Sequence, residues 1–269
     1  MARHVVIDLN VLEGKIEEFV EPDDQLVLPH VIFAEIVGAY QSKRVSRFKK
    51  HLDVFQHWYR SHRENIWVAC EWGVIADREV SIGHPIAANE WRDEEFSLKL
   101  RASAQESADQ WGWRILAADC SQTLRDFDDR KHAFLEGCDH FKTYLTEHEP
   151  SAVLLLKQSA ENAMQGVREP FCGTFWTPNQ APYNSPDWIK ELRRWPSTLA
   201  VGRMSRIACW YGQKLAMGQT KDFANNYEDG LYGFTASYTG YLATEDENLR
   251  QMVKAVFGDR VTVLVKKPK

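Results

Sequence analysis

The chain has 269 residues, of which 44% are hydrophobic and 12% aromatic, so it can bury the core of one large α/β domain or of two small ones. Its formal net charge of −5 excludes binding of nucleic acid through the field of the whole molecule, which leaves only local basic faces for such a role. No apolar run approaches the roughly 20 residues of a bilayer span, and the amino-terminal apolar segment is too short for a secretory signal. We therefore expect a cytoplasmic protein without a membrane partner.

Cysteine and histidine spacing argues against two common kinds of site. The five cysteines are scattered and form no C-x-x-C pair, and the nine histidines show neither H-x-H nor H-E-x-x-H spacing. A disulfide framework and a dedicated zinc site are therefore not expected.

Short apolar runs alternate with helical patterns along the chain. Continuous apolar runs of this length are typical of parallel strands that are covered on both faces. The expected strands are 4–8, 25–28, 66–69, 241–243 and 261–265. Helices are expected at 31–40, 72–80, 197–217, 227–238 and 248–257. This alternation predicts an α/β fold with a mainly parallel central sheet.

The middle of the chain differs in composition from both ends. Residues 89–165 are almost free of Gly and Pro and rich in helix-forming residues, which predicts two to four long helices. Residues 166–187 then form a long Pro/Gly/Asn loop with several aromatic residues, and such a loop is often functional. The alternative for these aromatic residues is packing over the helices.

Two helices carry cations beside an apolar stripe. Lys43 and Arg47 fall largely off the stripe of a helix over 45–59, and Arg203, Arg206 and Lys214 line one face of helix 197–217. Cations beside an aromatic residue suit an RNA backbone and base. A solvated face, or arginine stems that cover apolar surface, explains them as well.

Four acidic residues occupy informative positions. Asp8 lies at the carboxyl end of the first expected strand, and Asp246 comes shortly after strand 241–243. A carboxylate at the end of a buried strand points into the crevice where open α/β sheets bind ligands. Glu35 lies inside a helix that is apolar almost all round, where an ionised carboxylate is costly unless it is paired or metal-bound. Asp229 lies in the first turn of helix 227–238.

Each acid also has a structural explanation. Asp8 or Asn10 can cap the helix that starts near Val11, and Glu35 can pair with a buried arginine. Asn225 with Glu228, and Thr244 with Glu247, have capping-box spacing. Under that interpretation Asp229 and Asp246 are first-turn acids favoured by the helix dipole. Small residues around Gly233 leave room beside Asp229, or serve close helix packing.

Taken together, the four acids favour a shared cation site. Crowded carboxylates repel one another, and a bound divalent cation relieves that repulsion. Mg²⁺ or Mn²⁺ takes such oxygen ligands and keeps several waters. We assign Asp229 and Asp246 as ligands, and Glu228 and Glu247 as caps.

The ordered set of acid-containing motifs resembles that of the PIN-domain nucleases. V-V-I-D-L-N-V-L resembles their first motif and contributes Asp8 with Asn10, and L-P-x-V-x-x-E-I resembles the second and contributes Glu35. N-x-x-D resembles the third and contributes Asn226 and Asp229. L-A-T-E-D-x-N-L resembles the fourth and contributes Thr244 and Asp246. The order of the motifs, and the short helix-turn-strand between the last two, also match.

The resemblance implies a three-layer α/β/α sandwich and metal-dependent cleavage of RNA, usually single-stranded. The four acids would coordinate Mg²⁺ or Mn²⁺, and one would help to activate the attacking water. The PIN-like core would comprise 1–85 and 197–269, and 86–196 would be a helical insertion, longer than the family usually has. The partners it suggests are RNA, a protein inhibitor or regulator, and a second copy in a homodimer. A toxin or defence role fits this activity.

Two other functions compete with the nuclease. An apolar strand that ends in Asp8 also suits the nucleophile of a haloacid-dehalogenase-like phosphatase, but that family expects a second acid where this chain has Asn10. A non-catalytic PIN-like scaffold that binds a protein partner is the second alternative, and the presence of all four acids argues against it.

Overall fold

The computed structural model describes residues 2–12, 16–41, 63–102, 120–148, 150, 199–219 and 225–266. Its centre is a five-stranded sheet in which every pair of neighbouring strands is parallel. In spatial order the strands are β3 (Ile66–Val68), β2 (Gln25–Leu28), β1 (His4–Ile7), β4 (Gly240–Ala243) and β5 (Thr262–Leu264). The expected strands are confirmed, each within one or two residues of its bounds.

The apolar runs explain why the sheet is central. Val5, Val6 and Ile7 of β1 are fully buried, as are Val27 and Leu28 of β2. Consecutive buried residues mean that both faces of these strands are covered, as in parallel sheets flanked by helices. The α/β class is confirmed, and the architecture is consistent with a three-layer α/β/α sandwich.

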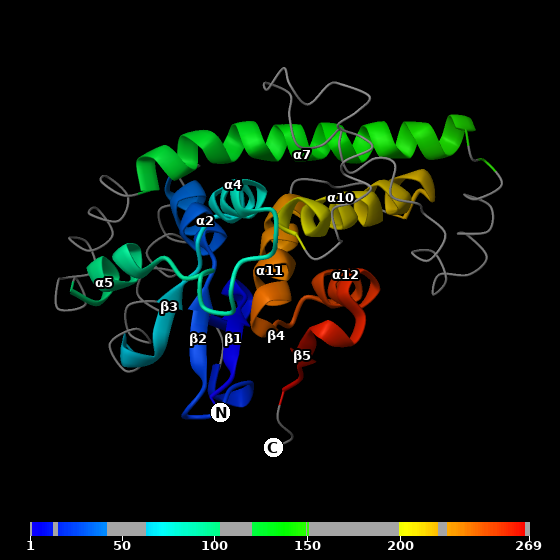
Figure 1. Cartoon of the computed structure of the whole chain (residues 1–269). Helices are drawn as coiled ribbons and strands as arrows, with labels where there is room; N and C mark the ends of the chain where they lie inside the picture. Colours follow the sequence, from blue (N-terminus) through cyan, green and yellow to red (C-terminus); the bar gives the residue numbers. More distant parts are fainter. Residues whose placement is uncertain are drawn as a thin grey trace.

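Helices cover the sheet and its carboxyl edge (Figure 1). The described α-helices are α1 (Leu9–Leu12), α2 (His30–Gln41), α4 (Trp72–Ile82), α5 (Glu94–Ala102), α7 (Cys120–His148), α10 (Ala200–Ala216), α11 (Asn226–Thr239) and α12 (Glu247–Phe257). Short 3₁₀ turns are η1 (Ile16–Glu18), η2 (Arg63–Asn65) and η6 (Gly258–Arg260). The long helix α7 crosses the top of the view, above α2, α4 and α10.

Strand β1 lies where the chain changes direction across the sheet. Its neighbours are β2 on one side and β4 on the other, so the later strands run outward in both directions. The carboxyl ends of β1 and β4 are paired, with Ile7 opposite Ala243, and the Asp8 amide donates to the Ala243 carbonyl at 3.1 Å. In open α/β sheets this topological switch point is where ligands bind.

The beginning of the expected insertion shares the core of the sheet. The Ser97 hydroxyl of α5 accepts from the Val68 amide at 2.9 Å, and Arg101 donates to the Ile66 carbonyl at 2.8 Å. Phe96 and Leu100 are buried in the same core cluster. Residues up to about 101 therefore pack with β3, beyond residue 85, where the resemblance to PIN-domain nucleases places the end of the first part of the core. The loop 166–187 lies outside the described residues.

Close helix packing accounts for the glycines of α11. A Cβ at Gly233 would lie 2.4 Å from the Met252 side chain of α12, so this position keeps α12 near. Gly240 ends the helix with a φ of 86°, a left-handed conformation that glycine adopts without strain, and β4 starts at once. The packing explanation for Gly233 is supported, and the tight turn holds the carboxyl end of β4 beside β1.

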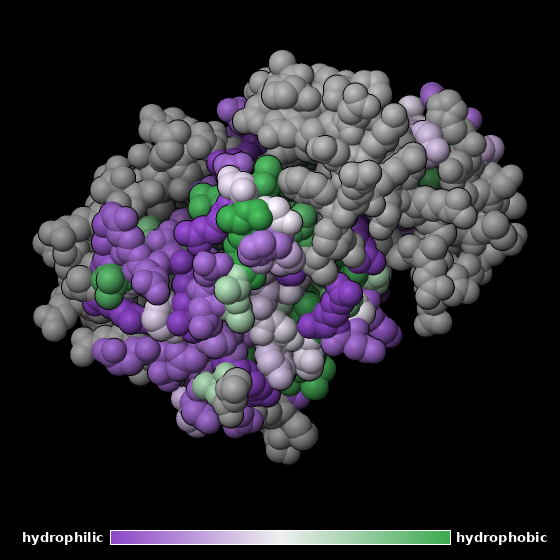
Figure 2. All heavy atoms as spheres, in the orientation of Figure 1, coloured by the Kyte–Doolittle hydropathy of each residue, from purple (hydrophilic) through white to green (hydrophobic). Residues whose placement is uncertain are grey.

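The described surface is mainly polar on the face shown in Figure 2, and hydrophobic side chains gather over α4. On that helix Val74 is 53% and Ile82 44% exposed. None of the described helices is both long enough and apolar enough to cross a membrane.

Candidate functional site

The four predicted acids all lie toward the carboxyl edge of the sheet. Asp8 follows β1, and Asp246 lies between β4 and α12, where it is the N-cap residue. Glu35 is in the second turn of α2, which begins just after β2, and Asp229 is in the first turn of α11. Two strand ends and two helices thus carry them, as the motif order led us to expect.

Asp8 is 4% exposed and is held by neutral groups. Its Oδ2 accepts hydrogen bonds from the Thr244 hydroxyl at 2.6 Å and from the Asn10 amide at 3.4 Å. The same Thr244 oxygen accepts from the Asp246 amide at 3.0 Å. Thr244 therefore fixes both Asp8 and the backbone of Asp246, a supporting role that agrees with its place in the fourth motif.

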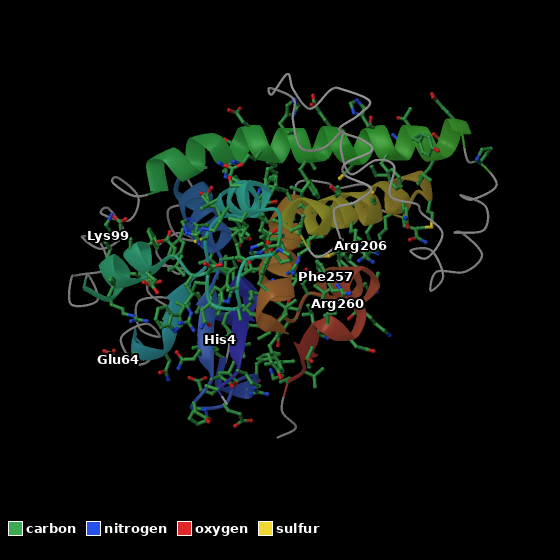
Figure 3. All side chains as sticks on the ribbon, in the orientation of Figure 1. His4, Glu64, Lys99, Arg206, Phe257 and Arg260 are labelled. Atoms are coloured by element: carbon green, nitrogen blue, oxygen red, sulfur yellow. The ribbon has the colours of Figure 1, made fainter. Side chains whose placement is uncertain are left out.

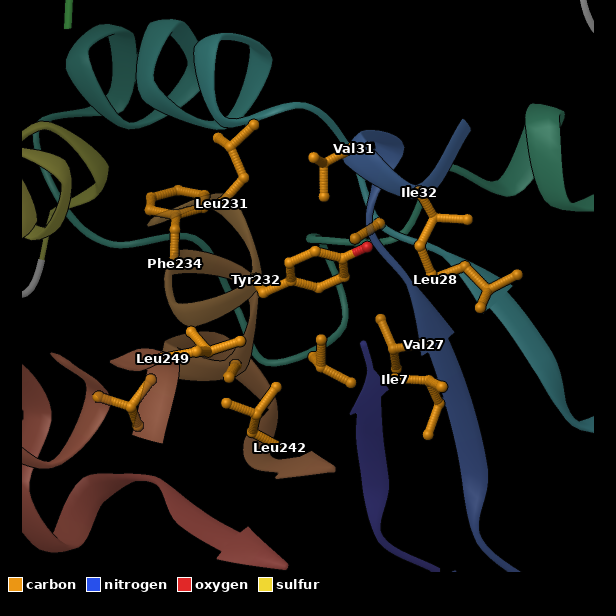
Figure 4. Close-up of a cluster of buried hydrophobic side chains, with 14 of the residues drawn as sticks. Ile7, Val27, Leu28, Val31, Ile32, Leu231, Tyr232, Phe234, Leu242 and Leu249 are labelled. Carbon is orange, nitrogen blue, oxygen red and sulfur yellow. The ribbon is translucent and has the colours of Figure 1, made fainter. Parts of the chain in front are cut away.

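Glu35 is held by a tyrosine rather than by an arginine. The Tyr232 hydroxyl of α11 donates to Glu35 Oε2 at 2.5 Å, and Figure 4 shows this hydroxyl pointing from α11 toward α2. The carboxyl group is enclosed, although the residue keeps some exposure. Burial, together with the charges of Asp8, Glu228 and Asp229, raises the pKa of Glu35 to about 8 against the opposing effect of the Tyr232 hydrogen bond.

The pKa of Asp229 is raised by burial and by charges of the same group of acids. Burial, then the charges of Asp246 and Asp8, raise its pKa to about 7, and a side-chain hydrogen bond with Asn248 opposes them. Burial is also the main cause of a raised pKa at Asp8, with a smaller contribution from the charge of Asp246. Because the charge of Asp8 acts on both Glu35 and Asp229, and that of Asp246 acts on both Asp8 and Asp229, the four carboxylates occupy one electrostatic neighbourhood.

No ion pair among the described residues neutralises Asp8, Glu35, Asp229 or Asp246. Neither do three or more Asp, Glu, His or Cys side chains in the described part of the chain stand close enough to form a ready-made metal cluster. The repulsion between these acids therefore has no compensating ion pair among the described residues, and Thr244, Tyr232 and Leu249 each donate a hydrogen bond to one of them. Anionic oxygens in this situation fit a hard divalent cation.

The capping predictions are corrected in part. Asp246 does cap α12, because its Oδ1 accepts from the Leu249 amide at 2.9 Å. The Thr244–Glu247 capping box is wrong, since the Thr244 hydroxyl binds Asp8 and Glu247 accepts instead from Gln251. Asp246 thus combines a structural role through Oδ1 with an Oδ2 that is left for other contacts.

The Asn225–Glu228 capping box is also wrong, because Asn225 makes no side-chain cap and Glu228 has another partner. Glu228 Oε1 pairs with Lys131 of α7 at 2.5 Å, and its Oε2 is buried without a hydrogen-bond partner. Its charge raises the pKa of both Glu35 and Asp229. Glu228 is therefore a fifth acid of the candidate site. Its spacing from Asn225 had predicted a capping role instead.

Asn226 and Asn10 accompany the acids in different ways. Asn226 is 4% exposed, and its Nδ2 has no hydrogen-bond partner. Asn10 is exposed and donates to Asp8. A buried amide that lacks a partner is costly, so Asn226 is a further polar group that a ligand in this region would satisfy.

The predicted basic residues are placed only in part beside the acids. Arg203 donates to the Ser237 carbonyl at 2.7 Å and its hydroxyl at 2.8 Å, and its guanidinium stacks on the Tyr238 ring. Lys214 contacts Asn248 at 3.3 Å and lies over the Trp210 ring. Arg206 lies on α10 (Figure 3). Lys43 and Arg47 lie outside the described residues. Arg203 thus has internal partners that account for it without RNA.

A pocket opens between α2, α4, α7 and α11. Arg130, Trp72 and Tyr227 contribute to its walls, and the Trp72 indole donates to the Tyr227 hydroxyl at 3.0 Å. Arg130 also pairs with Glu71, just after β3. These residues tie α7 to the core beside the acids.

Comparisons with protein-family models, with curated proteins and with solved structures find no match to this chain.

Proposed function

We propose that this protein is a metal-dependent endoribonuclease that cuts single-stranded RNA. The observation that carries the proposal is the set of four acids, Asp8, Glu35, Asp229 and Asp246, whose charges act on one another without a compensating ion pair among the described residues. The ordered motifs that resemble those of PIN-domain nucleases support it, and so does the position of the acids at the switch point of a parallel sheet.

The residues fit a divalent cation such as Mg²⁺ or Mn²⁺. Asp8 Oδ1 and Asp246 Oδ2 are the carboxylate oxygens that remain after the bonds to Thr244 and Leu249, and Glu35 and Asp229 would complete the set with Glu228 beside them. When bound, such a cation lowers the pKa of a coordinated water and neutralises charge on the phosphate and the leaving oxygen.

The chain's own groups orient the acids for this chemistry. Thr244 and Asn10 fix Asp8, and Tyr232 fixes Glu35, so neither carboxylate has to be ordered when substrate binds. The pKa of Glu35 is about 8 without a cation, so Glu35 would lose its proton and serve as a carboxylate ligand when a divalent cation binds at neutral pH.

The test is cleavage of a uniformly labelled single-stranded RNA in Mn²⁺ or Mg²⁺. Wild type should produce internal cuts, and Asp8→Asn should lower the rate by at least about a hundredfold, the usual size of such an electrostatic contribution. Glu247→Gln is the matched control, because its side chain is 69% exposed and lies one residue from Asp246. Full activity of Asp8→Asn, or cleavage of single-stranded DNA alone, would contradict the proposal.

A further inference from the structure

The acids create an electrostatic problem for the proposed substrate. At least five carboxyl groups, including Glu228, act on one another at the carboxyl edge, and the chain as a whole is negative. An RNA phosphate that approaches this edge is repelled unless a cation stands near its path. One described residue that meets this requirement, through an ion pair with an acid of the site, comes from the middle of the chain.

Helix α7 brings that cation to the site. It packs on α10 and also contacts α2 and α11, the two helices that carry Glu35 and Asp229 (Figure 1). Lys131 pairs with Glu228 at 2.5 Å, and Glu228 directly precedes Asp229. The Lys131 side chain is 23% exposed, so part of it meets solvent while its ammonium binds Glu228.

An ammonium group has three N–H donors. Among the described contacts, the Lys131 ammonium donates one of these N–H groups to Glu228. The other two remain for an anion that arrives from solvent, and lysine is a common phosphate ligand in proteins. The flexible stem also lets the charge shift toward a phosphate while it stays near Glu228.

Docking of α7 does not depend on this ion pair. Phe134 packs against Tyr211 and Tyr227, and Phe127 packs against Tyr227, with ring centroids 5.2–6.2 Å apart. Arg130 pairs with Glu71 as a second polar attachment. A partly buried ion pair adds little stability after its desolvation cost. Attachment of α7 to the core is therefore a weak explanation for a lysine at position 131.

We propose that Lys131 is a substrate-binding residue that holds an RNA phosphate beside the acidic site, so that the central helical region completes the site. The inference rests on the proposed nuclease function and deepens it. It assigns α7, which falls within the expected insertion, a direct role in substrate binding. It also gives the phosphate one cationic contact beside the acidic site of a protein whose net charge is −5.

The test measures binding of a fluorescein-labelled single-stranded RNA by fluorescence anisotropy between 50 and 200 mM salt, in the Asp8→Asn background so that the RNA stays intact. Lys131→Gln should weaken binding by about tenfold at low salt, as expected for a lost charged hydrogen bond. It should also reduce the slope of log K against log salt by about 0.7, the value for one phosphate contact on a single strand. Lys131→Arg should restore most of both.

Two matched controls on the same helix separate substrate binding from docking. Arg130→Gln removes the neighbouring ion pair to the core, and Lys142→Gln removes an exposed charge that pairs within the helix. Both should keep the wild-type salt slope. Lys131→Gln with an unchanged slope, or Arg130→Gln with the same change, overturns the inference. If wild type cleaves RNA, that result leaves the nuclease proposal intact; if wild type neither cuts nor binds RNA, both fail.

Discussion

Thr244 donates a buried hydrogen bond to Asp8 across 236 residues of sequence, and the two oxygens are 2.6 Å apart. The Thr244 hydroxyl also accepts from the Asp246 amide, so one small side chain sets the relation between the ends of β1 and β4. Half of the candidate site is assembled by this contact before any ligand arrives.

Replacement of Thr244 by valine should therefore affect both stability and activity. Thr244→Val keeps the shape but removes the donor to Asp8, which keeps only the weaker bond from Asn10, and leaves the Asp246 amide without its partner, so the free energy of unfolding should fall by about 1–3 kcal/mol. Urea denaturation measures this change, and the RNA cleavage rate should fall more than tenfold. Thr146→Val on α7 is the control, because its exposed hydroxyl donates only to backbone carbonyls of the same helix. An unaltered cleavage rate in Thr244→Val would contradict the assigned role.

Removal of the Tyr232 hydroxyl should weaken cation binding. This hydroxyl lowers the pKa of Glu35, so Tyr232→Phe should raise that pKa further above about 8 and leave less carboxylate at pH 7. The apparent affinity for Mn²⁺, measured by calorimetry at pH 7, should then fall several-fold. Tyr238→Phe removes a comparable hydroxyl, which binds Glu79 at 2.9 Å, and should leave Mn²⁺ affinity unchanged. Equal losses in the two variants would argue against a specific role for Tyr232.

The cation-free protein should become less stable as pH rises from about 4.5 to 8. The pKa of Glu35 is about 8 in the folded state against an ordinary 4.5, and that of Asp229 is about 7 against 3.8. In this window the folded state keeps protons that the unfolded chain has released, so the free energy of unfolding falls with increasing pH and levels off above pH 8. Glu35→Gln should remove up to about 5 kcal/mol of this loss, from a pKa shift of 4.5 to about 8 at roughly 1.4 kcal/mol per pKa unit.

Chemical denaturation in the presence of a chelator, at several pH values, measures whether the free energy of unfolding falls as pH increases. Addition of Mn²⁺ at pH 8 should restore stability in wild type, since a ligand that binds only the folded state stabilises it. Stability of the chelated protein that rises between pH 5 and 8 would show that Glu35 and Asp229 do not carry raised pKa values.

Arg203 should act on stability rather than on RNA binding. Arg203→Gln loses two hydrogen bonds to Ser237 and the stacking on Tyr238, so the free energy of unfolding should fall by about 1–3 kcal/mol. Arg206→Gln on the same helix should change it by less than about 0.5 kcal/mol. Thermal or urea unfolding compares them, and an identical small effect of both would contradict the internal role of Arg203.

The sequence predicted the sheet well because its strands are continuous apolar runs. Asp8 and Asp246 followed from these runs, since parallel strands place their carboxyl ends at one edge. Glu35 was recognisable because a carboxylate within an apolar helix needs a partner. Its actual partner, Tyr232, is 197 residues away and is a buried tyrosine of α11, so no local pattern marked it.

The pairing of Glu228 with Lys131 could not be predicted from the sequence. Glu228 had capping-box spacing, and only the packing of α7 on α11 shows that Lys131 draws it away from Asn225. Lys131 itself lies in a helix whose charges look like an ordinary solvated face, and its partner is 97 residues distant. Phe96 and Leu100, which lie in the expected insertion, pack into the same core as the sheet, and their spacing in the sequence does not indicate this contact.

The most direct measurement of the central claim is a Mn²⁺ titration followed by the paramagnetic resonance signal of the free ion at pH 7.5. Wild type should bind Mn²⁺, and Asp8→Asn, Glu35→Gln, Asp229→Asn and Asp246→Asn should each weaken that binding by about tenfold or more, because all four share one site. Glu247→Gln should bind as wild type does. If wild type binds no Mn²⁺ at millimolar concentration, or if the four variants bind it like wild type, the acids do not form a cation site.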